Sequence, residues 1–158
     1  MKKLLLVEDD AVVGMNQSLI LKKEGYEVVR ALNAEKGIAL VREEVPPVDM
    51  VLMDIDLGRG MDGAEAARQI LAARDIPVIF LTSHTEKEII ERTAGITNYG
   101  YVLKTSGEEV LSASIRMAFR LHDALRALRE SEEKYSKAFH TSPDSVNLNR
   151  LSDGVYFA

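Results

Sequence analysis

The stretch DMVLM at residues 49–53 is an apolar run of strand length, and it leads directly into DIDLGRGMDG at residues 54–63, which is rich in aspartate and glycine. Four similar runs rich in Val, Ile and Leu occur elsewhere: KLLLV (3–7), YEVVR (26–30), PVIFL (77–81) and YGYVL (99–103). The segments between these runs carry apolar residues at helical spacing. Strand and helix therefore alternate five times.

This alternation predicts a doubly wound α/β domain over residues 1 to 122, because unbroken apolar strands of a parallel sheet need helices on both faces. Gly25 stands where a helix C-cap is expected, Pro46 and Pro47 break the second helix, and Pro77 opens the fourth strand. No Gly or Pro occurs between Gly107 and Pro143. An extended C-terminal helix is therefore expected.

The composition excludes several kinds of chemistry. The 158 residues include no cysteine, so disulfides, thiolate catalysis and cysteine-bound zinc are ruled out, and a metal must be held by oxygen atoms. The formal net charge of −5 gives no general attraction to nucleic acid or to an anionic membrane. No apolar run is long enough to span a membrane, and the N-terminus does not read as a signal peptide. We expect a cytoplasmic protein.

Chemically useful side chains follow four of the five predicted strands. They are Glu8 and Asp9 after the first, Asp54 and Asp56 after the third, Thr82 and Ser83 after the fourth, and Lys104 after the fifth. In a doubly wound fold the carboxyl ends of the strands share one edge, where ligands collect. Carboxylates gathered there suit Mg²⁺, while a lysine and a threonine hydroxyl donate hydrogen bonds to an anion beside it.

Asp54 follows the most apolar central strand, so its backbone is fixed at this edge. A carboxylate in such a place can attack phosphorus and form an aspartyl phosphate. Mg²⁺ and Lys104 would then neutralise the transferring phosphoryl group, and Thr82 would hydrogen-bond one of its oxygens. The residue types predict a phosphoryl acceptor.

Four motifs in this order resemble the receiver domain of two-component response regulators: VEDD (7–10), MDIDLGRGMDG (53–63), IFLTS (79–83) and YGYVLK (99–104). The resemblance implies a flavodoxin-like sheet with strand order 2-1-3-4-5, and a phosphoryl donor that is a histidine kinase or phosphotransfer protein. It also implies a role for each matching residue: Asp54 as phosphoacceptor and metal ligand, Glu8 and Asp9 as metal ligands, Asp56 as a backbone carbonyl ligand, Thr82 and Lys104 as catalytic groups, and Tyr101 as the aromatic switch.

Three positions depart from the family pattern. Leu57 and Gly58 replace Met-Pro, and Gly63 lies one residue later than usual, so the loop that follows Asp54 should be longer. Thr105 rather than proline follows Lys104; a cis bond there would be strained, since without proline it costs on the order of 3 kcal/mol. Glu8 replaces the commoner aspartate and lengthens the arm to the metal.

Simpler interpretations exist for several of these residues. Asp10 and Asp62 are expected to be helix N-caps, and Asp9 alone could be a first-turn acid that complements the helix dipole. Thr82 alone could be a turn residue, Lys104 a surface lysine and Tyr101 a packing residue. No histidine has metal-ligand spacing with another, so we expect ordinary surface or interface positions for His84, His122 and His140.

The C-terminal part of the chain suggests self-association and a further domain. Leu121, Leu128 and Tyr135 recur every seven residues, with small residues between them, so residues 123–140 are expected to be a helical linker that forms a homodimeric coiled coil. The alternative is one amphipathic helix packed on its own domain. Residues 128–158 resemble the opening of a PAS sensory domain, of which 141–158 would be a truncated start too short to bury a core.

The sequence thus predicts a phosphoacceptor module of a phosphorelay, cut from a longer protein such as a sensor or hybrid histidine kinase. It would dephosphorylate itself but would not be a classical enzyme. Two alternatives come from other classes. The Asp-x-Asp run at Asp54 resembles that of haloacid-dehalogenase-like phosphatases, which carry it on the first strand. An FMN module shares the fold, but the acidic stretch at residues 8–10 would repel its phosphate.

Overall fold

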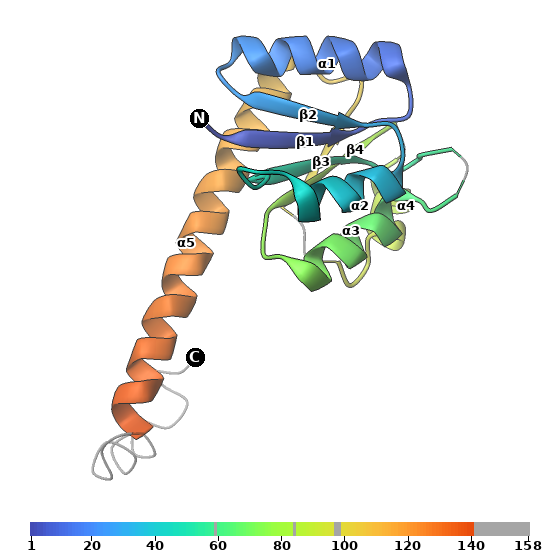
Figure 1. Ribbon diagram of the computed structural model, residues 1–158. Coiled ribbons are helices and arrows are strands. Elements are labelled where there is room, and N and C mark those ends of the chain that lie inside the picture. The colour runs from blue at the N-terminus through green and yellow to red at the C-terminus, as the bar shows by residue number, and fades with distance from the viewer. Residues whose placement is uncertain (59, 84, 97–98, 141–158) are drawn as a thin grey trace. The chain divides into compact units, whose positions relative to one another are not determined.

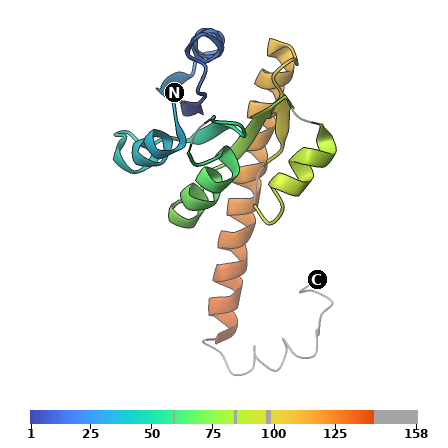
Figure 2. The same ribbon diagram turned by 90° about the vertical axis from the view of Figure 1, so that its right-hand side faces the viewer.

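Five parallel strands form one sheet in a computed structural model that describes residues 1–58, 60–83, 85–96 and 99–140. The strand order is β2-β1-β3-β4-β5. The strands are β1 (Lys3–Val7), β2 (Glu27–Ala31), β3 (Met50–Asp54), β4 (Val78–Thr82) and β5 (Tyr101–Leu103). The helices are α1 (Ala11–Lys23), α2 (Ala34–Glu43), α3 (Gly63–Ala73), α4 (Glu86–Arg92) and α5 (Glu108–His140) (Figure 1). The predicted doubly wound fold is confirmed, with helices on both sides of the sheet (Figure 2).

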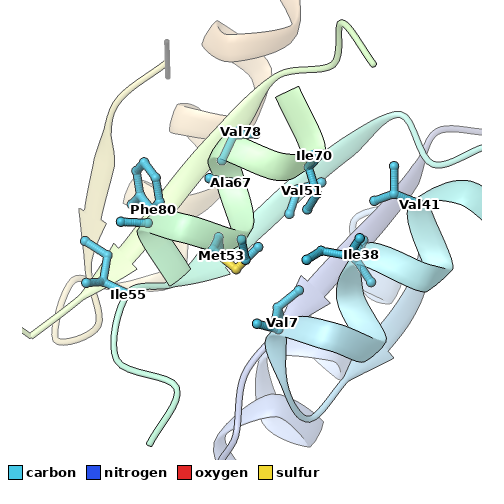
Figure 3. Packing of buried hydrophobic residues seen from close by; sticks show 14 of the residues in the cluster. Val7, Ile38, Val41, Val51, Met53, Ile55, Ala67, Ile70, Val78 and Phe80 are labelled. Atoms are coloured by element: carbon cyan, nitrogen blue, oxygen red, sulfur yellow. The ribbon is translucent and has the colours of Figure 1, made fainter. Parts of the chain in front are cut away.

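The sheet separates two hydrophobic clusters, because successive strand residues point to opposite faces. Leu5 and Val7 of β1 join a cluster covered by α2, α3 and α4, to which α4 contributes Ile89. Figure 3 shows Val7 in this cluster with Ile38 and Ile70. Leu4 and Leu6 of the same strand join the cluster on the other face, which α1 covers with Leu21 and the first part of α5 with Leu111 and Ile115. Burial on both faces explains why the strands read as unbroken apolar runs.

Side chains cap the helices where the sequence predicts. The carboxylate of Asp10 accepts hydrogen bonds from the N–H groups of Val12 and Val13 at 3.0 and 3.1 Å. That of Asp62 accepts one from the N–H of Glu65 at 2.9 Å. The C-cap residue of α1 is Glu24, and Gly25 follows it with φ of +97°, a conformation that favours glycine. The two predicted N-caps are confirmed, and the glycine lies one residue beyond the C-cap.

Four of the five strands begin later than their apolar runs suggest. β2, β3 and β4 begin one residue later, and β5 begins at Tyr101 rather than at residue 99. As a result Asp54 and Thr82 are the last residues of their strands and share the fixed geometry of the ladder. The one cis peptide bond among the described residues is Val45–Pro46, so the bond between Lys104 and Thr105 is trans.

The chain divides into two units, Met1–His122 and Asp123–Ala158, and α5 contributes residues to both. His122 is buried, with Nε2 3.3 Å from Asp75 Oδ1 and its ring edge-on to Tyr99; the expectation of a surface or interface residue was wrong for this histidine.

Residues 123–135 are helical and exposed throughout. The predicted PAS start at 141–158 lies outside the described residues. No helix in the described ranges has the length and hydropathy to cross a membrane.

Candidate functional site

The parallel strands bring the predicted site residues to one edge of the sheet. Asp54 ends β3 and is in register with Leu81 of β4, while Thr82 ends β4 and is in register with Leu103 of β5. Glu8 follows β1, whose last residue Val7 pairs with Met53. The N–H of Lys104 donates to the carbonyl of Thr82 at 2.7 Å, which fixes the lysine directly after β5.

Three carboxylates meet at this edge. Glu8, Asp9 and Asp54 each offer one oxygen, and these oxygens all lie within 4.8 Å of one another. Glu8 and Asp54 are buried, with 3% and 1% of their surface exposed, whereas Asp9 is exposed. The Oε2 atom of Glu8 is buried and forms an ion pair with Lys104. An oxygen-only set of this kind fits a hard divalent cation such as Mg²⁺.

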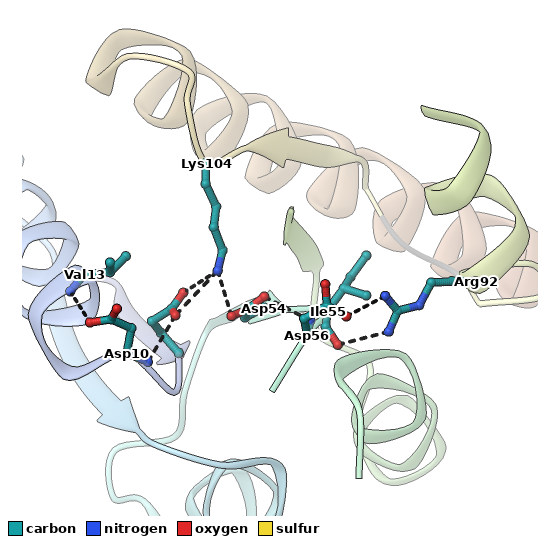
Figure 4. Close-up of polar contacts among 8 residues, drawn as sticks. Asp10, Val13, Asp54, Ile55, Asp56, Arg92 and Lys104 are labelled. Carbon is teal, nitrogen blue, oxygen red and sulfur yellow. Dashed lines mark hydrogen bonds and ion pairs between the residues drawn. The ribbon is translucent and has the colours of Figure 1, made fainter. Parts of the chain in front are cut away.

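Lys104 lies between the two buried carboxylates. Its Nζ atom is 2.8 Å from Asp54 Oδ2 (Figure 4). The same atom is 3.1 Å from Glu8 Oε2. The remaining oxygen of each carboxylate accepts a backbone hydrogen bond: Asp54 Oδ1 from the N–H of Asp56 at 3.0 Å, and Glu8 Oε1 from the N–H of Asp10 at 3.2 Å. The ammonium group therefore holds both acids in a fixed arrangement.

Burial disturbs the protonation of this cluster. Desolvation, followed by the charge of Asp54, raises the pKa of Glu8 to about 7, although Lys104 opposes the rise. Desolvation also raises the pKa of Asp54, against the hydrogen bond and charge of Lys104. Burial alone would lower the pKa of Lys104, but its ion pairs with Asp54 and Glu8 outweigh burial and raise it. One ammonium group is thus shared by two crowded carboxylates, an arrangement that a second cation would relieve.

The other predicted site residues occupy three different settings. Thr82 is buried at the end of β4. Tyr101, on β5, is 37% exposed. The carboxylate of Asp56 is not a member of the acidic cluster among the described residues, and its Oδ1 atom instead lies 2.7 Å from Nη1 of Arg92. The structure therefore brings together Glu8, Asp9, Asp54 and Lys104, and it turns the Asp56 side chain toward α4.

The connection between β3 and α3 is held close to the strand end. Gly58 and Gly60 have φ values of +70° and +87°, in the left-handed region that favours glycine. The N–H of Gly63 donates to the carbonyl of Ile55 at 2.9 Å and closes the loop. Arg92 also contacts this loop, a role that the sequence analysis missed, because no local pattern marks an arginine whose partners lie 30 or more positions away.

The doubly wound sheet, with three carboxylates and a lysine at its carboxyl edge, is a CheY-like fold. The chain belongs to the response regulator receiver domain family, whose model matches residues 4–116. That match covers most of the unit Met1–His122.

The curated relatives that this chain matches are longer than it is. It is 28% identical over 141 residues to the transcriptional regulatory protein PdtaR of Mycobacterium tuberculosis, covering 89% of this chain and 67% of PdtaR. It is 34% identical over 138 residues to the transcriptional regulatory protein AfsQ1 of Streptomyces coelicolor, covering 86% of this chain and 57% of AfsQ1. The chain thus spans little more than half of the second relative.

Two solved structures are similar to this chain in both fold and sequence. One is the N-terminal domain of a response regulator/sensory box/GGDEF three-domain protein from Carboxydothermus hydrogenoformans. It has a TM-score of 0.72 and 43% identity over 78% of this chain and 98% of that one. The other is the signal receiver domain of a modulated diguanylate cyclase from Desulfovibrio desulfuricans, with a TM-score of 0.70, 29% identity and the same coverage.

Proposed function

We propose that this receiver domain accepts a phosphoryl group on Asp54 from a phosphohistidine of a histidine kinase or phosphotransfer protein. The observation that carries the proposal is the contact between Lys104 Nζ and both Asp54 and Glu8 at the edge of the sheet. Asp54 is buried, ends a central strand and is paired with Leu81 of β4 in the ladder. A nucleophile held in this way needs little reorganisation before it reacts.

In the proposed step an oxygen of Asp54 attacks the phosphorus atom. A P–O bond forms, the P–N bond to the donor imidazole breaks, and its electron pair stays with the leaving nitrogen. Lys104, which now pairs with the Asp54 carboxylate, would pair with the phosphoryl oxygens after transfer. The Thr82 hydroxyl would donate a hydrogen bond to one of these oxygens. Mg²⁺, held by Glu8, Asp9, Asp54 and the backbone carbonyl of Asp56, would supply further positive charge to these oxygens.

Hydrolysis of the acyl phosphate would return Asp54 to its starting state, so the domain acts as a timed switch rather than a classical enzyme. The alternative of a haloacid-dehalogenase-like phosphatase gains no support, since those enzymes carry the Asp-x-Asp run on the first strand. Here Asp54 ends the third strand of the chain.

The proposed output passes through Tyr101 and α5 to the region that follows. Leu121, Leu128 and Tyr135 are exposed and recur at heptad spacing, which supports a homodimeric coiled coil. A PAS-containing output in a cytoplasmic sensor or hybrid kinase remains our proposal for the parent protein. The Carboxydothermus three-domain protein supports the proposed sensory region, because it combines a response regulator domain with a sensory box and a GGDEF domain.

Intact-mass measurement after incubation with acetyl phosphate and Mg²⁺ tests the phosphoacceptor. The wild type should gain the mass of one phosphoryl group, and Asp54→Asn should gain none. Asp123→Asn is the matched control, because Asp123 is an exposed aspartate outside the site. An adduct that persists in Asp54→Asn, or a wild type that is never modified, would contradict the proposal.

A further inference from the structure

Arg92 connects the end of α4 to both ends of the β3–α3 loop. Its Nη1 atom lies 2.7 Å from Asp56 Oδ1, at the start of the loop. Its Nη2 atom lies 3.4 Å from the carbonyl oxygen of Ile55 and 3.4 Å from Oδ2 of Asp62, the N-cap of α3 (Figure 4 shows the contacts to Ile55 and Asp56). A planar guanidinium group can hold several acceptors in fixed directions, which a lysine ammonium cannot do as well.

The contacted loop is the one that departs from the family pattern. It is one residue longer and contains two glycines with positive φ, so its own sequence gives it little stiffness. Asp56 is held from two sides: its N–H donates to the carboxylate of Asp54, and its side chain pairs with Arg92. The carbonyl of Asp56 is the group proposed to face the cation.

We propose that Arg92 is a positioning residue for the cation site, which fixes the β3–α3 loop so that the Asp56 backbone carbonyl is presented to Mg²⁺. The inference rests on the proposed function, because it requires that the acidic cluster binds the cation. It also makes α4 a support of the site. A displacement of α4 would withdraw Arg92 and weaken cation binding, and cation binding would in turn favour the observed position of α4.

Charge alone makes the opposite prediction. Arg92 is positive and close to the acidic edge, so removing its charge should strengthen the attraction of the site for a divalent cation. Removing a group that positions a ligand should weaken it, typically by tenfold or more for groups that orient metal ligands. The sign of the change in Mg²⁺ affinity therefore separates positioning from simple electrostatics.

The test is calorimetric titration of the full chain with Mg²⁺ for the wild type, Arg92→Met and Arg68→Met. Arg68 is the matched control, because it is a half-exposed arginine on α3 that forms an i,i+3 ion pair with Glu65 at 3.3 Å. We expect Arg92→Met to bind Mg²⁺ about tenfold more weakly than the wild type. Arg68→Met should bind as the wild type does. Unchanged or tighter binding by Arg92→Met would overturn the inference.

Two further measurements separate a positioning role of Arg92 from a purely structural role. The increase in unfolding midpoint caused by Mg²⁺, relative to EDTA, should shrink in Arg92→Met; a loss of stability that is equal in EDTA and in Mg²⁺ would indicate a structural role only and overturn the inference. In a double-mutant cycle with Asp56→Asn, the second substitution should add little to the first, since Arg92 acts through Asp56; fully additive losses would contradict that route. A wild type that binds no Mg²⁺ would instead refute the proposed function itself.

Discussion

Gly63, the first residue of α3, lies against the backbone of Asp54, the proposed phosphoacceptor. A Cβ atom added at Gly63 would overlap the carbonyl oxygen of Asp54 and would lie 2.9 Å from the Cα of Ile55. Both groups belong to the backbone, so neither can rotate away. The glycine that stands one residue later than the family pattern therefore allows the helix to begin directly beside the site.

Gly63→Ser should destabilise the protein and disturb Asp54. We expect a loss of about 1–3 kcal/mol in the free energy of unfolding, as for other cases of overpacking. Gly107→Ser is the matched control, because a Cβ at Gly107 meets no atom within 4 Å. Urea unfolding of both variants checks the prediction. Equal stability of Gly63→Ser and wild type would mean that α3 can move away from the strand at little cost.

Replacement of Lys104 by methionine should leave two buried carboxylates without their cation. We expect the metal-free protein to lose about 1–3 kcal/mol of stability, as when a buried polar group loses its partner. Mg²⁺ should restore more stability to Lys104→Met than to the wild type, because a divalent cation can take over part of the lost charge. Chemical unfolding in EDTA and in Mg²⁺ measures both effects; a variant as stable as the wild type in EDTA would refute the claim.

The pKa of Glu8 predicts how stability depends on pH. It is raised from 4.5 to about 7 in the folded protein, so the folded state binds this proton more tightly than the unfolded state. The resulting stabilisation is fully present below pH 4.5 and is lost as the pH rises through about 7.

Urea unfolding in EDTA, measured between about pH 5 and pH 8, tests this dependence. The free energy of unfolding of the wild type should fall with rising pH relative to that of Glu8→Gln, which carries no titrating group at this position. Mg²⁺ should reduce the fall, because it favours the ionised carboxylate. Parallel profiles for the two proteins would contradict the prediction.

Charge placed on the exposed heptad positions of α5 should prevent the proposed dimer. Leu128→Glu should shift the chain toward the monomer in analytical ultracentrifugation, since a carboxylate at a seam position must be buried by association. Ala127→Glu, at the neighbouring exposed position, should leave the oligomeric state unchanged. A wild type that is monomeric at every concentration, with or without phosphorylation, would exclude this route of self-association.

Local sequence patterns and sheet topology were sufficient to predict the helix caps and the residues at the strand ends. The caps at Asp10 and Asp62 follow from sequence neighbours alone, because their acceptors and donors are two or three residues apart. The pairing of Lys104 with Asp54 spans 50 positions, yet it could be predicted because parallel strands deliver their carboxyl ends to one edge. The topology of a parallel sheet therefore predicts which strand-end residues come together.

Local patterns and sheet topology did not predict the contacts of residues on the outer helices and in the loops. The contacts of Arg92 depend on the path of a loop with two glycines and on where α4 packs, and neither has a periodic signal. His122 was wrongly expected at the surface, because its burial comes from Asp75 and Tyr99, which lie 47 and 23 positions earlier in the chain. A single polar residue on a helix does not indicate which distant segments will cover it.

The way in which α4 is attached has a consequence for its mobility. Among the seven residues of this helix, Ile89 is the one whose described side chain is fully buried, and Arg92 makes the polar contacts to the neighbouring loop. Burial of one isoleucine is worth about 1.5–3 kcal/mol. Because α4 buries so little apolar side-chain area, we expect hydrogen exchange to find it among the first helices of the domain to open.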